Sequence, residues 1–176
     1  MTDEIGLVQR RLEEEGVKML AFFEGLAGAD WARTVYVDGS GWTVRDLLAH
    51  FLSAEQTYVE YIRRLLRGEA GLPSDFDLNA FNETEVPRLR RRSTDELLGA
   101  LRSARAETVT TVAGLVPGDL ERRGWHPWFG DTDLGSVLKL LYRHPMIHLR
   151  DVRRALKAGK PVRSSEGSEA GEEAGS

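Results

Sequence analysis

The chain has 176 residues, of which 41% are hydrophobic, and this supports one domain with a single sizeable core rather than two domains. The absence of cysteine excludes disulfides, cysteine-ligated zinc, iron–sulfur clusters and cysteine nucleophiles, so any thiol chemistry requires an external thiol. A formal net charge of -4 argues against nucleic acid as the main partner.

The N-terminal stretch MTDEIGLVQ has no feature of a secretory signal. It is acidic and amphipathic, and it lacks a basic start and an apolar run. No later apolar run approaches the length that crosses a bilayer. We therefore expect a soluble cytoplasmic protein that does not act at a membrane.

Apolar residues at helical spacing predict a first helix over residues 5–26. Asp3 and Glu4 favour its beginning, because acidic side chains stabilise the positive end of the helix dipole. Gly28 ends this helix. Residues 30–41 then form a connector, in which a V-Y-V run predicts a short extended piece before a D-G-S-G turn.

The second predicted helix has a well-defined start. Thr43 as N-cap and Asp46 three residues later form a capping box, in which each side chain binds the backbone N–H of the other residue. The apolar stripe of this helix continues to Leu65, and His50 lies at the edge of the stripe. Basic residues at the end of the helix face the negative end of its dipole: Arg63, Arg64 and Arg67.

Residues 68–87 are rich in Gly, Pro, Asp and Asn, and predict a long loop with a short helix around residues 78–85. A loop of this length in a compact domain is often functional. A third helix begins at Ser93, which forms a capping box with Glu96, and its stripe runs to Leu115 before a P-G stop. The arginines ahead of it indicate a solvated run or, alternatively, an anionic-substrate or nucleic-acid patch: Arg88, Arg90, Arg91 and Arg92.

A second loop over residues 122–133 precedes the last predicted helix. It holds His126 between two tryptophans, where a histidine either packs as a turn residue or lines the mouth of a pocket. The fourth helix begins near residues 131–132 and runs to about Lys157. Pro145 lies inside it, removes one backbone hydrogen bond and predicts a kink.

These elements predict an all-α fold, a four-helix bundle with long inter-helix loops. Residues 163–176 consist of Ser, Gly, Glu and Ala apart from one arginine, a composition that cannot form a packed core. We therefore expect a folded domain over residues 1–160 and a disordered C-terminal tail over residues 161–176. Ligand and metal sites in such bundles lie in the core, between facing helices.

Three histidines of the predicted helices are candidate metal ligands. His144 and His148 are four residues apart, so both project from the same face of the fourth helix. His50 is the third candidate, and three protein ligands leave an open position on the ion. The spacing alone fits equally well a pair of partly exposed residues and a hydrogen-bonded core histidine. Glu55 and Asp151 could orient the imidazoles or form ordinary surface pairs.

The order of these motifs resembles the DinB-like superfamily, which includes the metal-binding domain of mycothiol-dependent maleylpyruvate isomerase. The resemblance covers roughly residues 5–158 and rests on W-T-V-R-D-L-L-A-H at residues 42–50, F-N at residues 81–82 and H-x-x-x-H at residues 144–148. It implies a divalent metal ion, zinc or nickel, held by His50, His144 and His148. Many relatives carry a glutamine where this chain has Asp151.

The resemblance also implies a function. We expect a metal-dependent enzyme in which a low-molecular-weight thiol or water attacks a small-molecule electrophile, for example thiol S-transfer, detoxification or hydrolysis. It further implies a homodimer, while the acidic charge and the lack of a long apolar run argue against nucleic acid and membrane as partners. The alternative is a non-catalytic stress-response or ligand-binding protein that keeps the bundle, since a fold alone does not fix an activity.

Overall fold

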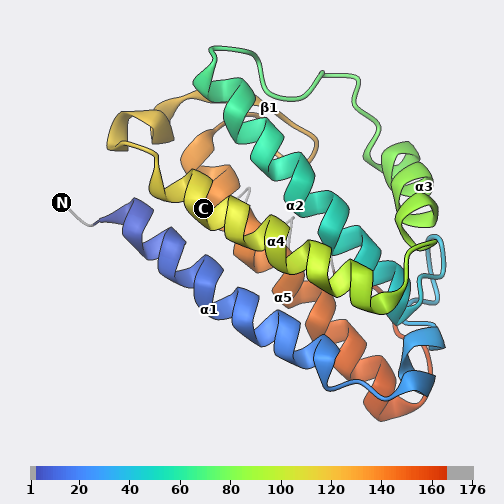
Figure 1. Cartoon of the computed structure of the whole chain (residues 1–176). Coiled ribbons are helices and arrows are strands. Elements are labelled where there is room, and N and C mark those ends of the chain that lie inside the picture. Colours follow the sequence, from blue (N-terminus) through green and yellow to red (C-terminus); the bar gives the residue numbers. More distant parts are fainter. Residues whose placement is uncertain (1–2, 166–176) are drawn as a thin grey trace.

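Four long helices lie side by side in the computed structural model, which describes residues 3–165 (Figure 1). They are α1 (Glu4–Glu24), α2 (Val44–Leu66), α4 (Thr94–Ala113) and α5 (Leu134–Ala158). Helix α4 packs against α1 and α2, and α5 packs against the same two helices. The predicted all-α four-helix bundle is therefore confirmed.

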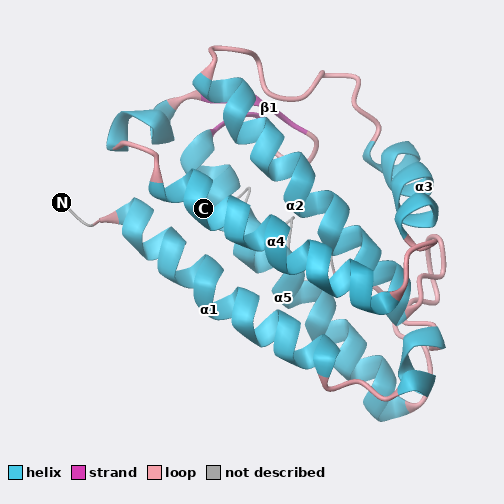
Figure 2. Ribbon diagram, in the orientation of Figure 1, coloured by secondary structure: helices cyan, strands magenta, loops and turns pink. Residues whose placement is uncertain are grey.

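Shorter elements fill the connections between the four helices (Figure 2). They are the 3-10 helices η1 (Gly28–Ala32) and η2 (Pro117–Glu121), the helix α3 (Leu78–Leu89), and the strands β1 (Arg123–His126) and β2 (Gly130–Asp133). Helix α3 packs beside α2, outside the four-helix core (Figure 1). Within residues 3–165, no helix combines the length and the apolarity that a membrane crossing requires.

The apolar stripes of the sequence form the core of the bundle. Buried side chains gather in two clusters, one near the start of α2 around Phe23, Leu48 and Phe51, and one towards its end around Leu12 and Ile62. Burying each such side chain stabilises the fold by about 1.5–3 kcal/mol relative to an exposed position. The contact between these apolar faces is thus a main source of the stability of the bundle.

Both predicted capping boxes are present. The Thr43 hydroxyl accepts from the Asp46 N–H at 3.2 Å while the Asp46 carboxylate accepts from the Thr43 N–H at 2.9 Å. Ser93 and Glu96 repeat this arrangement at the start of α4. These caps fix where α2 and α4 begin, which is why the sequence placed both starts correctly.

Residues 122–133 do not form the irregular loop that the sequence predicted, but contain an antiparallel hairpin. Strands β1 and β2 pair from Arg123–Asp133 to His126–Gly130, and Gly130 takes the positive φ of 67° that closes the turn. Because β2 extends to Asp133, helix α5 begins at Leu134 rather than at residues 131–132. The strands are too short to show a clear alternation of apolar and polar residues, so the hairpin left no sequence signal.

The segment after α2 pairs with the hairpin through its backbone. The Trp125 N–H donates to the Ala70 carbonyl at 2.9 Å, and the Leu72 N–H donates to the Trp125 carbonyl at 3.2 Å. Gly71 allows this approach, since it has a φ of 79° and a Cβ there would lie 2.9 Å from the Trp125 carbonyl oxygen. The long loop is therefore attached to the hairpin at its beginning.

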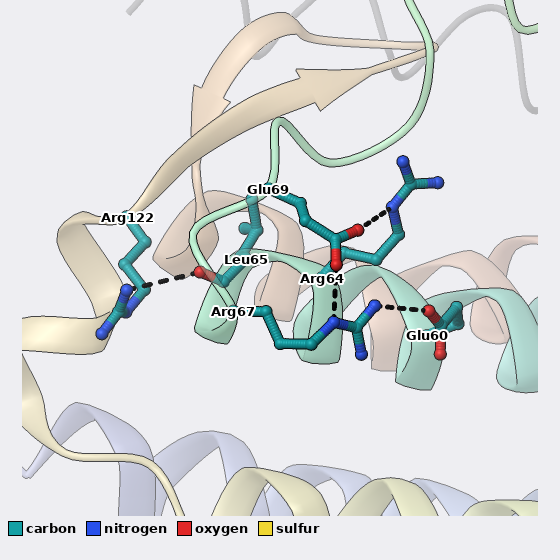
Figure 3. Close-up of polar contacts among 6 residues, drawn as sticks. All are labelled: Glu60, Arg64, Leu65, Arg67, Glu69 and Arg122. Atoms are coloured by element: carbon teal, nitrogen blue, oxygen red, sulfur yellow. Dashed lines mark hydrogen bonds and ion pairs between the residues drawn. The ribbon is translucent and has the colours of Figure 1, made fainter.

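Charged side chains also connect the C-terminal end of α2 with the start of the long loop and with the segment before the hairpin (Figure 3). Arg67 donates to Glu69 at 2.6 Å and to Glu60 at 3.0 Å, and Arg64 donates to Glu69 at 3.0 Å. Arg122 donates to the Leu65 carbonyl at 3.3 Å, near the C-terminal end of α2. Exposed pairs of this kind contribute little stability, about 0–1 kcal/mol each. Their effect is to orient the loop relative to α2.

Helix α3 extends to Leu89, four residues beyond the predicted end at residue 85, and contains Pro87 in its last turn. Pro145 likewise lies within α5, which is assigned as helix without interruption from Leu134 to Ala158. A proline inside a helix lacks its own N–H and its ring crowds the carbonyl four residues earlier, but packing on both sides can keep the flanking turns helical, and the kink at Pro145 stays a prediction. Pro145 is buried, consistent with such packing.

The connector before α2 pairs with residues near the C-terminus. The Val162 N–H donates to the Val35 carbonyl at 2.8 Å, and the Val37 N–H donates to the Val162 carbonyl at 3.0 Å. The predicted V-Y-V extended piece is thus observed, with Tyr36 opposite Val162. Of the segment predicted as a tail, residues 166–176 lie outside the described residues.

Candidate metal centre

The structure brings together the three histidines that the sequence singled out. His50 comes from α2, and His144 and His148 come from successive turns of α5. All three are buried, with exposed fractions of 5%, 4% and 1%. One ring nitrogen from each lies within 4.8 Å of the other two. Among the described residues, these three histidines are the only group of three or more His, Asp or Glu side chains close enough to hold one metal ion.

The distances between the imidazole nitrogens match those of ligands around one ion. His144 Nε2 lies 3.0 Å from His50 Nε2 and 3.0 Å from His148 Nε2. Two nitrogens bound about 2.1 Å from a common ion, at angles between a right angle and a tetrahedral one, are about 3.0–3.4 Å apart. A ring nitrogen has either one hydrogen or one lone pair, so His144 Nε2 cannot form good hydrogen bonds to both neighbours. A shared cation satisfies all three lone pairs.

Tyr36 contacts the cluster from the connector before α2. Its hydroxyl lies 2.6 Å from His148 Nδ1, and both residues are buried. A proton on Nδ1 leaves the lone pair on Nε2 free for a metal ion, and a partner at Nδ1 fixes the orientation of the ring. Sequence reasoning noted the V-Y-V run but gave Tyr36 no role, because this contact joins residues 112 positions apart.

Aromatic rings surround the histidines. The Trp42 ring lies 4.7 Å from the His50 ring, and the Trp128 ring contacts the His144 ring edge to face at 5.6 Å, centroid to centroid. Phe51 packs 5.8 Å from the His148 ring. These rings exclude water from most of the cluster, which strengthens electrostatic interactions at the site.

Two cavities adjoin the cluster. A chamber of about 50 Å³ is lined by His50 and His144 on one side and by residues of α2, α3, the hairpin and the loop over residues 68–77 on the other. A wider, open cleft of about 690 Å³ is lined by Tyr36 and Trp42, which contact His148 and His50. Only the chamber is lined by the histidines themselves, whereas Tyr36 and Trp42 lie between the cleft and the cluster.

His126 is the last residue of strand β1, and its side chain lines the chamber, as one of the two alternatives from the sequence expected. Its Nδ1 accepts a hydrogen bond from the Trp128 N–H at 3.3 Å, and its ring is parallel to that of Tyr58. Burial, together with the nearby His144, lowers the pKa of His126 to about 4. The side chain is therefore neutral near pH 7.

Glu55 and Asp151 have other partners. Glu55 pairs with Arg105 at 2.5 Å and accepts from the Thr108 hydroxyl at 2.5 Å, and burial raises its pKa despite these contacts. Asp151 accepts from the Ser165 N–H at 2.8 Å and from Arg154 at 3.0 Å. Both carboxylates are buried; Arg105, the partner of Glu55, is buried as well, whereas Arg154, the partner of Asp151, is half exposed.

Among solved structures, the chain is similar to YfiT from Bacillus subtilis, which is described as a probable metal-dependent hydrolase with an unusual four-helix bundle topology. The two chains are 20% identical, with a TM-score of 0.73 over 91% of this chain and 90% of YfiT. At this identity the likeness establishes the fold. No curated protein matches the sequence closely enough to count as a relative.

The sequence model of the DinB superfamily matches residues 11–152, a range that includes all three histidines of the cluster and most of the bundle. The resemblance seen in the motifs therefore extends over most of the chain, and the fold agrees with it. The chain belongs to the DinB superfamily.

Proposed function

We propose that this protein is a metal-dependent enzyme that acts on a small-molecule electrophile, with water or a low-molecular-weight thiol as the nucleophile. The convergence of three imidazole nitrogens within 4.8 Å of one another, with His144 Nε2 at 3.0 Å from each of the other two and a chamber beside them, carries this proposal. The description of YfiT as a probable metal-dependent hydrolase supports it.

His50, His144 and His148 would hold the ion, with zinc or nickel favoured because neutral imidazoles suit both. A divalent ion bound there would supply Lewis acidity at an open coordination position. Tyr36 keeps His148 in place through its contact with Nδ1. Trp42 and Trp128 limit the approach of water.

The chain itself supplies no cysteine nucleophile, so thiol transfer would use a free thiol such as mycothiol or bacillithiol. The open cleft beside Tyr36 and Trp42 is large enough for such a molecule, whereas the chamber is not. Hydrolysis would need only water. We further propose that the protein works as a homodimer.

A non-catalytic ligand-binding protein is the second candidate, and the small volume of the chamber favours it. A space of about 50 Å³ is a third of the roughly 150 Å³ that a benzene-binding cavity offers. A substrate therefore enters this chamber only if the chamber widens, whereas a protein that binds the ion alone needs no such space.

Elemental analysis of untagged protein, followed by turnover of an electrophile panel with and without added thiol, tests the proposal. We expect about one zinc or nickel ion per chain from the three-ligand arrangement. Turnover should depend on the ion and be lost in a His148→Ala variant. Equal rates for the metal-loaded protein and this variant would favour the binding protein instead. Dependence of the rate on thiol separates transfer from hydrolysis.

A further inference from the structure

The chamber and the cleft are neighbours that share part of their walls near the histidine cluster. Three residues line both cavities: Leu78, Asn82 and Trp128. Asn82 is the one among them whose side chain has both a hydrogen-bond donor and an acceptor. Within residues 3–165 its carboxamide forms no hydrogen bond, and it is partly exposed at the junction.

The two cavities differ in chemistry. The far walls of the chamber are mostly apolar or aromatic and include Tyr58, Phe76 and Phe81, and none of its described lining residues is acidic, Lys or Arg. The cleft is lined by two acidic residues, Asp38 and Glu83, with neither Lys nor Arg among its described lining residues. The chamber therefore favours an apolar group, and the cleft disfavours a negatively charged one.

We infer that the chamber and the cleft together form one binding site for an elongated, neutral or cationic organic molecule, and that Asn82 recognises its polar group at the junction. Any role of this site in a reaction rests on the proposed function, whereas the binding of the molecule does not. The apolar end of the ligand enters the chamber, which at about 50 Å³ holds roughly two or three heavy atoms, scaled from a benzene-sized cavity, and has to widen for a longer chain. The polar end lies in the cleft.

The arginines ahead of α4 do not change this preference. Arg88 pairs with Glu85 and Arg90 pairs with Asp46, and neither lines the chamber or the cleft. The anionic-substrate patch that the sequence left open is therefore not part of this site. An anionic ligand would gain attraction only from the ion itself.

Three probes of equal chain length test the charge preference: n-hexylamine, n-hexanol and n-hexanoate. Dissociation constants are measured by NMR titration of the full chain in metal-free form, because an ion would attract the carboxylate directly. We expect hexylamine to bind about fivefold more tightly than hexanoate, because the exposed carboxylates of Asp38 and Glu83 attract an ammonium group and repel a carboxylate. A variant with both Asp38→Asn and Glu83→Gln should reduce this ratio to about one.

Asn82→Leu tests recognition at the junction, and Asn79→Leu is its matched control, since Asn79 lies one turn earlier in α3 and lines the cleft only. We expect hexanol to bind roughly three- to tenfold more weakly to Asn82→Leu, in metal-free and zinc-loaded protein alike, with little change for Asn79→Leu. Circular dichroism checks that both variants fold.

The inference is overturned if wild type binds none of the probes, if metal-free protein prefers hexanoate, or if the two asparagine variants behave alike. These are binding results. A protein that shows the expected preferences but no turnover retains this inference and loses the proposed function.

Discussion

The Tyr36 hydroxyl lies 2.6 Å from His148 Nδ1, and this buried contact connects the connector before α2 to the centre of α5. Since His148 Nε2 faces the other two histidines, the Tyr36 contact determines which nitrogen is available to an ion. The backbone of Tyr36 is held in turn by the bonds of its two neighbours to Val162. The geometry of the site thus depends on a segment outside the four-helix core.

Tyr36→Phe should weaken zinc binding about ten- to hundredfold, because it removes the hydroxyl that orients His148 and keeps the ring. Competition with a chromophoric chelator measures the change. Tyr142→Phe is the control, since Tyr142 is a second tyrosine of the bundle that packs against the other core cluster. Equal zinc affinities in wild type and Tyr36→Phe would show that the hydroxyl does not orient the ligand.

Metal-induced stabilisation should depend on pH. Protons and a metal ion compete for the same imidazole nitrogens, so saturating zinc should raise the melting temperature at about pH 7.5 and do little at about pH 5. His148→Ala should lose most of the rise and still fold, because the helical stripes supply the core. An equal rise in wild type and variant would place the ion elsewhere.

His126 should make the metal-free protein less stable in acid. Its folded pKa of about 4 lies below the unfolded value of 6.5, so the unfolded chain takes up a proton first as the pH falls. Stability is therefore complete above about pH 6.5 and declines towards pH 4, by up to about 3 kcal/mol. Urea unfolding of wild type and His126→Gln across this range isolates the effect. Parallel stability curves would mean that His126 titrates normally.

The Glu55–Arg105 ion pair should be costly to break. Both side chains are buried, and Gly16 leaves room for Arg105, since a Cβ there would lie 3.0 Å from Arg105 Cγ. Arg105→Met should lower the unfolding free energy by about 3–5 kcal/mol, because it leaves a buried carboxylate unpaired. Adding Glu55→Met should recover part of the loss in chemical denaturation. A double variant less stable than the single one would contradict this explanation.

Residues 162–165 should contribute to stability. Val162 pairs with the connector on both sides of Tyr36, and Ser165 donates to the buried Asp151 from its N–H and its hydroxyl. Deleting residues 162–176 should cost about 2 kcal/mol and lower the melting temperature by several degrees relative to deleting residues 166–176. Equal melting temperatures for the two deletions would show that these bonds contribute nothing measurable.

The sequence determined the features that arise from local chemistry. Capping boxes at Thr43 and Ser93 set the starts of two helices, and the apolar stripes predicted the bundle. The i,i+4 spacing of His144 and His148 placed both on one face of α5, because helix geometry alone decides this. With His50 as the third candidate, the composition of the cluster was also predicted.

Only the tertiary structure decided which distant residues meet at the site. The contact between Tyr36 and His148, the hairpin that positions His126 and Trp128, and the buried pair of Glu55 with Arg105 all join separate parts of the chain. No local pattern encodes such contacts, because they depend on how the helices pack and where the loops return. For the same reason the sequence indicated neither the two cavities nor the position of Asn82 between them, although F-N at residues 81–82 was one of the motifs noted.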